Sequence, residues 1–146
     1  MPRQPPTERR VLALDLGERR IGVALSDVYG SLANPLTTIA ATPRPQAIRA
    51  IGKIIADYQV VELVVGLPLT LRGEIGPQAQ TVKSFAGEIA SALNVPVHFF
   101  DERLSSAAAD QMMRELGIKP DKRKQHIDQI AASIILQDYL DSTRGA

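Results

Sequence analysis

The run VVELVV, residues 60 to 65, is the feature that most constrains the fold of this chain. It is almost continuously apolar and rich in β-branched residues, as is typical of a strand that is covered on both faces. Such strands belong to parallel arrangements, in which helical connections pack against the sheet. The run therefore predicts an interior strand of a parallel sheet.

The segment before this run reads as an antiparallel meander of three strands. Residues 11–14 form a short apolar run, and the apolar residues of 21–25 alternate with small ones, so that the link GERR between them suits a hairpin. Residues 31–39 read as a weaker third strand. Pro35 interrupts it and indicates an edge strand or a bulge.

The segment after residue 40 alternates helices with strands. Apolar residues recur at helical spacing after Thr42-Pro43 and again between Val82 and Leu93, and residues 95–100 form a further strand. Two more helices are expected, at 104–116 and at about 127–140. The predicted fold class is α/β, a mixed five-stranded sheet with three antiparallel strands followed by parallel ones and flanked by helices.

Length and composition predict one cytoplasmic domain. The 146 residues fit a single core over 11–141, with a disordered tail at 1–10 and a flexible tail at 142–146. No apolar stretch approaches the ~18 residues of a membrane span. The net charge of +1 does not by itself indicate nucleic-acid binding. The absence of cysteine restricts any metal site to oxygen ligands or the two histidines, which favours hard cations.

Acidic residues follow the predicted parallel strands at the edge where ligands gather in such sheets. Asp15 ends the first strand, and Asp101 and Glu102 end the fifth. Because successive side chains of a strand face opposite ways, only one of that pair can point toward Asp15. Asp128, near the start of the last helix, borders the face that packs on the sheet and is a third candidate.

Three carboxylates aimed at one point require a cation, and Mg²⁺ or Mn²⁺ with oxygen ligands is the natural choice. Two such ions ~3.5 to 4 Å apart activate a water and stabilise the leaving oxygen of a phosphodiester. The competing interpretations are structural. Asp15 alone would be a turn residue, and Asp128 a first-turn acid that complements the helix dipole.

Four blocks of the sequence resemble the YqgF/RuvX family of RNase H-like proteins, described as pre-16S rRNA nucleases and as Holliday junction resolvases. The blocks are LALDLGERRIGVALSD, ELVVGLPLTLRGEIGPQAQTVKSFA, FFDERLSS and KQHIDQIAASIILQDYL, and they span about residues 11–140. The resemblance implies that Asp15, Glu102 and Asp128 are the catalytic, metal-binding acids, with Glu102 rather than Asp101 facing the site. Lys124 matches a lysine of the family, whereas Thr70 stands where the family usually carries asparagine.

Basic residues near these acids are candidates for binding substrate phosphates. They are Arg19, Arg103, Lys122, Arg123 and Lys124, with Arg20 and Arg72 as alternatives. The segment KPDKRK, residues 119–124, reads as a basic loop that either binds phosphates or is merely solvated, and Arg103 is equally an ion-pair partner.

Four other residues have structural interpretations that compete with functional ones. His98 is expected to be an ordinary packed histidine, and His126 a solvated one near the helix start. Gly17 and Gly22 suit a tight turn or a close backbone approach.

The sequence thus predicts a divalent-metal-dependent nuclease that acts on structured RNA or branched DNA. Within this class it does not separate precursor 16S rRNA from a four-way DNA junction, and the junction would require a homodimer. Alternatives from other classes are an actin-like nucleotide-binding domain, for which the chain has only half the expected length, and a non-catalytic nucleic-acid or ribosome-assembly module.

Overall fold

The computed structural model describes residues 9–70, 72–101, 114–115, 117 and 120–144, with the backbone alone for 120–126 and 144. Five strands form one sheet in the order β3-β2-β1-β4-β5. Their bounds are β1 Arg10–Leu16, β2 Arg20–Ser26, β3 Ala33–Ala40, β4 Val60–Leu67 and β5 Val97–Asp101. The pairs β1–β2 and β2–β3 are antiparallel, and β1–β4 and β4–β5 are parallel. The predicted mixed sheet is confirmed, with the VVELVV run in an interior strand.

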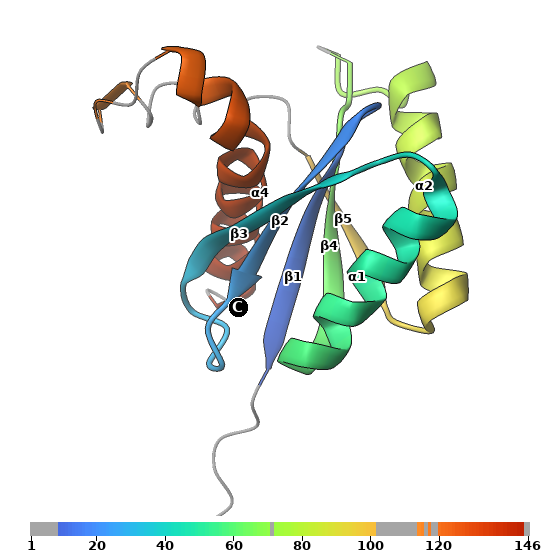
Figure 1. Ribbon diagram of the computed structural model, residues 1–146, viewed down its shortest axis with the longest axis horizontal. Coiled ribbons are helices and arrows are strands. Elements are labelled where there is room, and N and C mark those ends of the chain that lie inside the picture. Colours follow the sequence, from blue (N-terminus) through green and yellow to red (C-terminus); the bar gives the residue numbers. More distant parts are fainter. Residues whose placement is uncertain (1–8, 71, 102–113, 116, 118–119, 145–146) are drawn as a thin grey trace, which may run out of the picture.

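Helices cover both faces of this sheet (Figure 1). The helices α1 (Arg44–Tyr58) and α2 (Pro77–Leu93) lie on one face, and α4 (Pro120–Arg144) lies on the other. A larger apolar core fills the α1/α2 side and a smaller one fills the α4 side. No helix within the described residues is long and apolar enough to span a membrane.

The side chains of β1 alternate between these two cores. Leu12, Leu14 and Leu16 belong to the core under α1 and α2, whereas Val11 and Ala13 belong to the core under α4. Alternation continues along the strand, so Asp15 lies on the α4 face of the sheet.

The edge strand β3 explains Pro35. Its pairing with β2 shifts register between Val23 and Ala24, at the point where Ala24 opposes Pro35. The proline therefore stands both on an edge strand and at an irregularity, and each of these positions tolerates a missing N–H.

The last helix begins earlier than the sequence predicted. It starts at Pro120, a residue suited to the first helical turn, instead of at about Ile127, so most of the predicted basic loop is helical. Lysine, arginine and glutamine form helices well without an apolar stripe, which is why periodicity missed these turns. Asp128 consequently lies in the third turn, and its interpretation as a first-turn acid is wrong.

The folded segment also extends beyond the expected boundaries at both ends. Arg10 begins β1, and the N–H of Arg9 donates to the carbonyl of Val28 at 2.8 Å. At the other end α4 continues to Arg144. Most of the predicted helix at 104–116 lies outside the described residues.

Candidate functional site

Asp15 lies one residue before the end of β1, half-buried on the α4 face of the sheet. In the antiparallel ladder it pairs with Gly22 of β2. Directly opposed residues of such a ladder have Cα atoms about 4.5 to 5.5 Å apart and share one face. Any group that contacts Gly22 on this face is therefore a neighbour of Asp15.

The group that contacts Gly22 is the backbone of α4 at Asp128. A Cβ added at Gly22 would overlap the Asp128 carbonyl and would lie 2.9 Å from the backbone nitrogen of Gln129. Only glycine allows this approach. The structure thus brings together Asp15 and Asp128, which are separated by more than a hundred residues of sequence, and Gly22 makes the close approach to a helix rather than to a ligand.

An arginine already contacts Asp128. The Nε of Arg20 donates to Asp128 Oδ2 at 2.8 Å, and the two side chains are 56% and 24% exposed. Arg20 was expected only as an alternative phosphate-binding residue beside its neighbour Arg19, and its pairing with Asp128 was not expected. The signal was present in the sequence, because Arg20 and Gly22 are two residues apart and so lie on the same face of β2.

Arg19 lies in the exposed hairpin between β1 and β2, where its carbonyl accepts the N–H of Ala41 at 2.9 Å. The same hairpin explains Gly17, whose N–H donates to the Arg20 carbonyl at 2.9 Å. A Cβ at Gly17 would lie 2.6 Å from that oxygen. Gly17 therefore serves the tight turn.

Asp101 is the last residue of β5. Its side chain lies on the same face of the strand as those of Val97 and Phe99, because alternate residues share a face. Val97 packs against the core under α1 and α2, and Lys83 of α2 lies over the Phe99 ring. Asp101 therefore lies on the face opposite Asp15. Glu102 and Arg103 lie outside the described residues.

The basic residues Lys122, Arg123 and Lys124 lie in the first two turns of α4. The distance from Lys122 to Asp128 along a helix axis is about 9 Å. Only their backbone is described, and the same is true of His126. They lie on the segment of α4 that leads to the two acids.

His98 has structural partners at the other end of the sheet, although its side chain is 47% exposed rather than packed in the core. Its Nε2 lies 2.9 Å from Glu62 Oε2, and its ring stacks on Tyr139 with centroids 5.9 Å apart. Glu62 pairs with Val11, at the start of β1. This cluster is therefore remote from Asp15.

The two acids fit part of a site for a hard divalent cation. Both offer carboxylate oxygens on one face at the carboxyl edge of the parallel strands, the ligand type that Mg²⁺ and Mn²⁺ prefer. Within the described residues no group of three acidic, histidine or cysteine side chains could hold a metal ion. A third protein ligand would have to come from elsewhere in the chain.

Comparison with known proteins identifies the family. The family model described as "RuvX: Holliday junction resolvase" matches residues 9–142. The chain belongs to the RuvX family. Relatives from Chloroflexus aggregans and Roseiflexus sp. are each 58% identical to it, over 94% and 92% of this chain and 96% of each relative, and each is named "Putative pre-16S rRNA nuclease".

Solved structures agree with the RuvX assignment at the level of the fold. RuvC of T. thermophilus, in complex with a Holliday junction substrate, aligns with TM-score 0.58 and 18% identity, covering 94% of this chain and 96% of RuvC. The fowlpox virus Holliday junction resolvase aligns with TM-score 0.54 and 14% identity, covering 91% and 99%. At such identities the likeness shows only the fold, and it confirms the RNase H-like arrangement.

Thr70, which the sequence resemblance places at a position where asparagine is expected, has a local role. Its Oγ1 accepts the N–H of Glu74 at 3.1 Å, and its own N–H donates to the Glu74 carbonyl at 2.9 Å. The N–H of Gly73 donates to the Thr70 carbonyl at 2.8 Å. Thr70 therefore closes a turn in the loop after β4.

Proposed function

We propose that this protein is a divalent-metal-dependent nuclease that hydrolyses phosphodiester bonds in precursor 16S rRNA in the cytoplasm. The observation that carries the proposal is the convergence of Asp15 and Asp128 across Gly22, at the carboxyl edge of the parallel strands. The names of the relatives support the substrate, because they describe pre-16S rRNA nucleases.

In this proposal Asp15, Glu102 and Asp128 hold Mg²⁺ or Mn²⁺. When bound, the metal would lower the pKa of a coordinated water and neutralise charge on the leaving oxygen. The choice of Glu102 over its neighbour is supported by Asp101, which lies on the face of the sheet opposite Asp15.

Arg20 holds the Asp128 carboxylate in position before metal and substrate arrive. Both side chains are partly exposed, so their ion pair is worth less than about 1 kcal/mol and exchanges readily with other partners. The released guanidinium would then be free to bind a phosphate oxygen of the substrate.

Substrate phosphates are bound by the basic residues around the acids. We assign this role to Lys122, Arg123 and Lys124 at the start of α4, together with Arg19 and Arg103. Contacts to phosphates position a nucleic-acid strand but carry no sequence information, so this role does not require one base sequence.

The second candidate substrate is a four-way DNA junction. The family description names Holliday junction resolvases, and RuvC, which shares the fold, was solved with such a junction. Resolution needs two matched cuts, so this alternative requires a two-fold homodimer on the junction.

The deciding experiment is cleavage of labelled precursor 16S rRNA and four-way junction DNA side by side, with Mg²⁺, Mn²⁺ or a chelator. We expect RNA cleavage that requires metal. Faster junction cleavage by a dimer would favour the second candidate. Tight binding without turnover under every condition would contradict both and indicate a binding module.

A further inference from the structure

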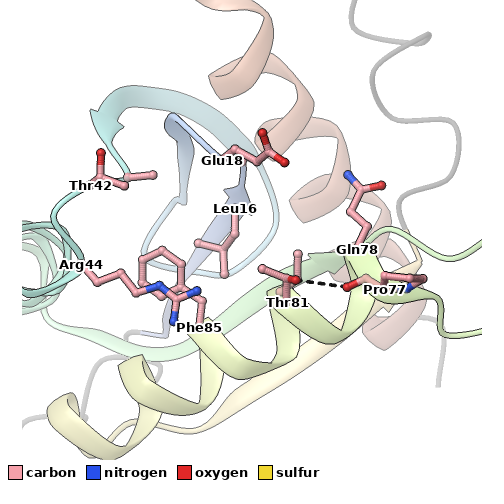
Figure 2. Close-up of a pocket in the computed structure, with 11 residues that line it drawn as sticks. Leu16, Glu18, Thr42, Arg44, Pro77, Gln78, Thr81 and Phe85 are labelled. Atoms are coloured by element: carbon pink, nitrogen blue, oxygen red, sulfur yellow. Dashed lines mark hydrogen bonds between the residues drawn. The ribbon is translucent and has the colours of Figure 1, made fainter.

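A cavity of about 660 Å³ lies on the α1/α2 face of the sheet, opposite the face of Asp15. Figure 2 shows residues that line it. It lies between the β1–β2 hairpin, the start of α1 and the start of α2. Pockets for small ligands typically have volumes of about 300 to 1,000 Å³. This cavity therefore has room for a group the size of one nucleotide base with its sugar.

The floor of the cavity is apolar and carries one planar cation. Leu16 and Phe85 contribute buried side chains, and the Arg44 guanidinium lies over the Phe85 ring, 4.6 Å from its centroid. Arg44 is also held by Glu88, with Nη1 2.8 Å from Oε2, yet its side chain remains 38% exposed. A guanidinium fixed in this way presents a flat surface on which a planar ring can stack.

The charges around the cavity disfavour a phosphate as its occupant. The positive charge of Arg44 is offset by Glu88, and Glu18 places a second carboxylate at the rim. The remaining polar lining includes the neutral side chains of Gln78 and Thr81, and Figure 2 shows both on α2. A neutral planar group with a hydrogen-bonding edge fits this lining better than an anion does.

The position of the cavity links it to the candidate metal site. Leu16 and Glu18 line the cavity and lie within three residues of Asp15 in the chain. Three residues span at most about 11 Å, so a strand whose phosphate lies at Asp15 can place a neighbouring nucleotide in the cavity by crossing the hairpin.

We propose that this cavity binds one unpaired base of the nucleic-acid strand, stacked on Arg44 with its polar edge toward Glu18 and Gln78. The inference rests on the proposed nuclease function, because it assumes that a strand passes Asp15. It adds a preference for a single-stranded nucleotide beside the scissile bond, since a paired base would first have to be unpaired and unstacked, at a cost in free energy, before it entered the cavity.

The test uses the full chain with EDTA present, so that binding is measured without cleavage. Fluorescein-labelled 12-nucleotide single strands, in RNA and DNA series, each carry one abasic residue that is moved along the strand. Stacking of one base supports an affinity difference of about tenfold. We expect one abasic position to weaken binding by that factor while the others change it little.

The variant Arg44→Lys keeps the charge but loses the planar surface. It should weaken binding of the intact strand about tenfold and remove the effect of the sensitive abasic position. Arg49→Lys is the matched control, because Arg49 is exposed on the same helix and does not line the cavity. Thr81→Trp, which fills the cavity from an exposed helical position, should reproduce the Arg44→Lys result.

A scan without a sensitive position, or an Arg44→Lys effect that is equal for intact and abasic strands, would overturn the inference. So would free GMP or AMP binding as tightly as the strands, because the cavity would then serve a free nucleotide. Failure of the nuclease proposal is separate, since it would appear as absent metal-dependent cleavage while the abasic scan in EDTA still showed its sensitive position.

Discussion

Carboxylates lie at both ends of the interface between α4 and the sheet, but they differ in exposure and in partners. At one end Glu62 is 7% exposed and accepts from Arg9 at 2.6 Å, lies 2.9 Å from His98, and contacts the Tyr139 hydroxyl at 3.4 Å. At the other end Asp128 is 24% exposed and pairs with the exposed Arg20. Eleven residues of helix, about 16 Å, separate Tyr139 from Asp128.

This difference distinguishes an acid that stabilises the fold from an acid that is accessible to a ligand. A carboxylate removed from water needs partners from its own chain, and Glu62 has them. The pKa of Arg9 is raised, first by its hydrogen bond to Glu62, and the pKa of Tyr139 is raised, first by burial and then by the Glu62 charge. Asp128 is nearer to water, and we propose that it exchanges its partner for an external cation. We call these the structural end and the site end.

The largest expected effect is at the site end. Asp15→Asn keeps the shape of the side chain but removes a ligand charge, so metal-dependent cleavage should fall about a thousandfold while the fold is kept. Initial rates with Mg²⁺ and Mn²⁺, together with circular dichroism, measure both. Asp101→Asn is the control, with at most a few-fold loss. Equal losses in the two variants would contradict the assignment of faces.

The next largest effect is expected on stability, when a side chain is added at Gly22, where α4 packs closely on β2. Gly22→Ala forces the helix away from β2, so the free energy of unfolding should fall by about 3 kcal/mol, measured by urea denaturation. Gly87→Ala in α2 is the matched control, because no atom of the described residues outside its own stretch of helix lies within 4 Å of its added Cβ. That change should be neutral or stabilising by up to about 1 kcal/mol. Similar values for both would mean that α4 does not sit on Gly22.

The two ends should also differ when a charge is removed. Glu62→Gln at the structural end should lower the free energy of unfolding by about 2 kcal/mol and leave cleavage nearly unchanged. Asp128→Asn at the site end should cost less than about 1 kcal/mol but abolish most cleavage. Urea denaturation and initial rates on the same two proteins test this, and a larger stability loss for Asp128→Asn would break the comparison.

The basic turns of α4 should matter for binding only. Lys122→Ala with Arg123→Ala should weaken binding of every nucleic acid about tenfold and flatten the plot of log affinity against log salt by ~0.7 to 0.9 for each phosphate that is no longer neutralised. Fluorescence anisotropy across a salt series measures this. Lys53→Ala, in α1 on the other face, is the control. Unchanged affinity and slope would mean that these turns are only solvated.

The smallest effect concerns Asp27, another acid that the chain satisfies itself. Burial raises its pKa, but hydrogen bonds from Ser31 and Leu32 outweigh this and leave the pKa below the usual 3.8. The resulting stability is present above that value and is lost as pH falls through the lower folded pKa. Asp27→Asn should therefore cost about 1 kcal/mol near neutral pH and reduce the acid-induced loss of stability. Asp57→Asn removes the carboxylate of the exposed pair with Lys53 and should leave the acid-induced loss of stability unchanged. Urea denaturation at several pH values measures both variants.

The sequence predicted the mixed sheet and the candidate site acids Asp15 and Asp128 through different signals. The β-branched run at 60–65 and the change from period two to helical spacing specified the mixed sheet, because burial on one or both faces imposes those patterns. The motif blocks pointed to Asp15 and Asp128 through resemblance. Periodicity could not find the first turns of α4, since residues 120–126 are mostly polar helix formers without an apolar stripe.

The sequence by itself determined which residues alternate and which faces of the strands are apolar, because these depend on local backbone geometry. It did not determine that Gly22 admits the Asp128 backbone, that Arg20 pairs with Asp128, or that Arg44 lies over Phe85. These contacts join residues that are distant along the chain. Only the packing of α4 and α2 on the two faces of one sheet decides them, because van der Waals and hydrogen-bond contacts depend on distances that no local pattern encodes.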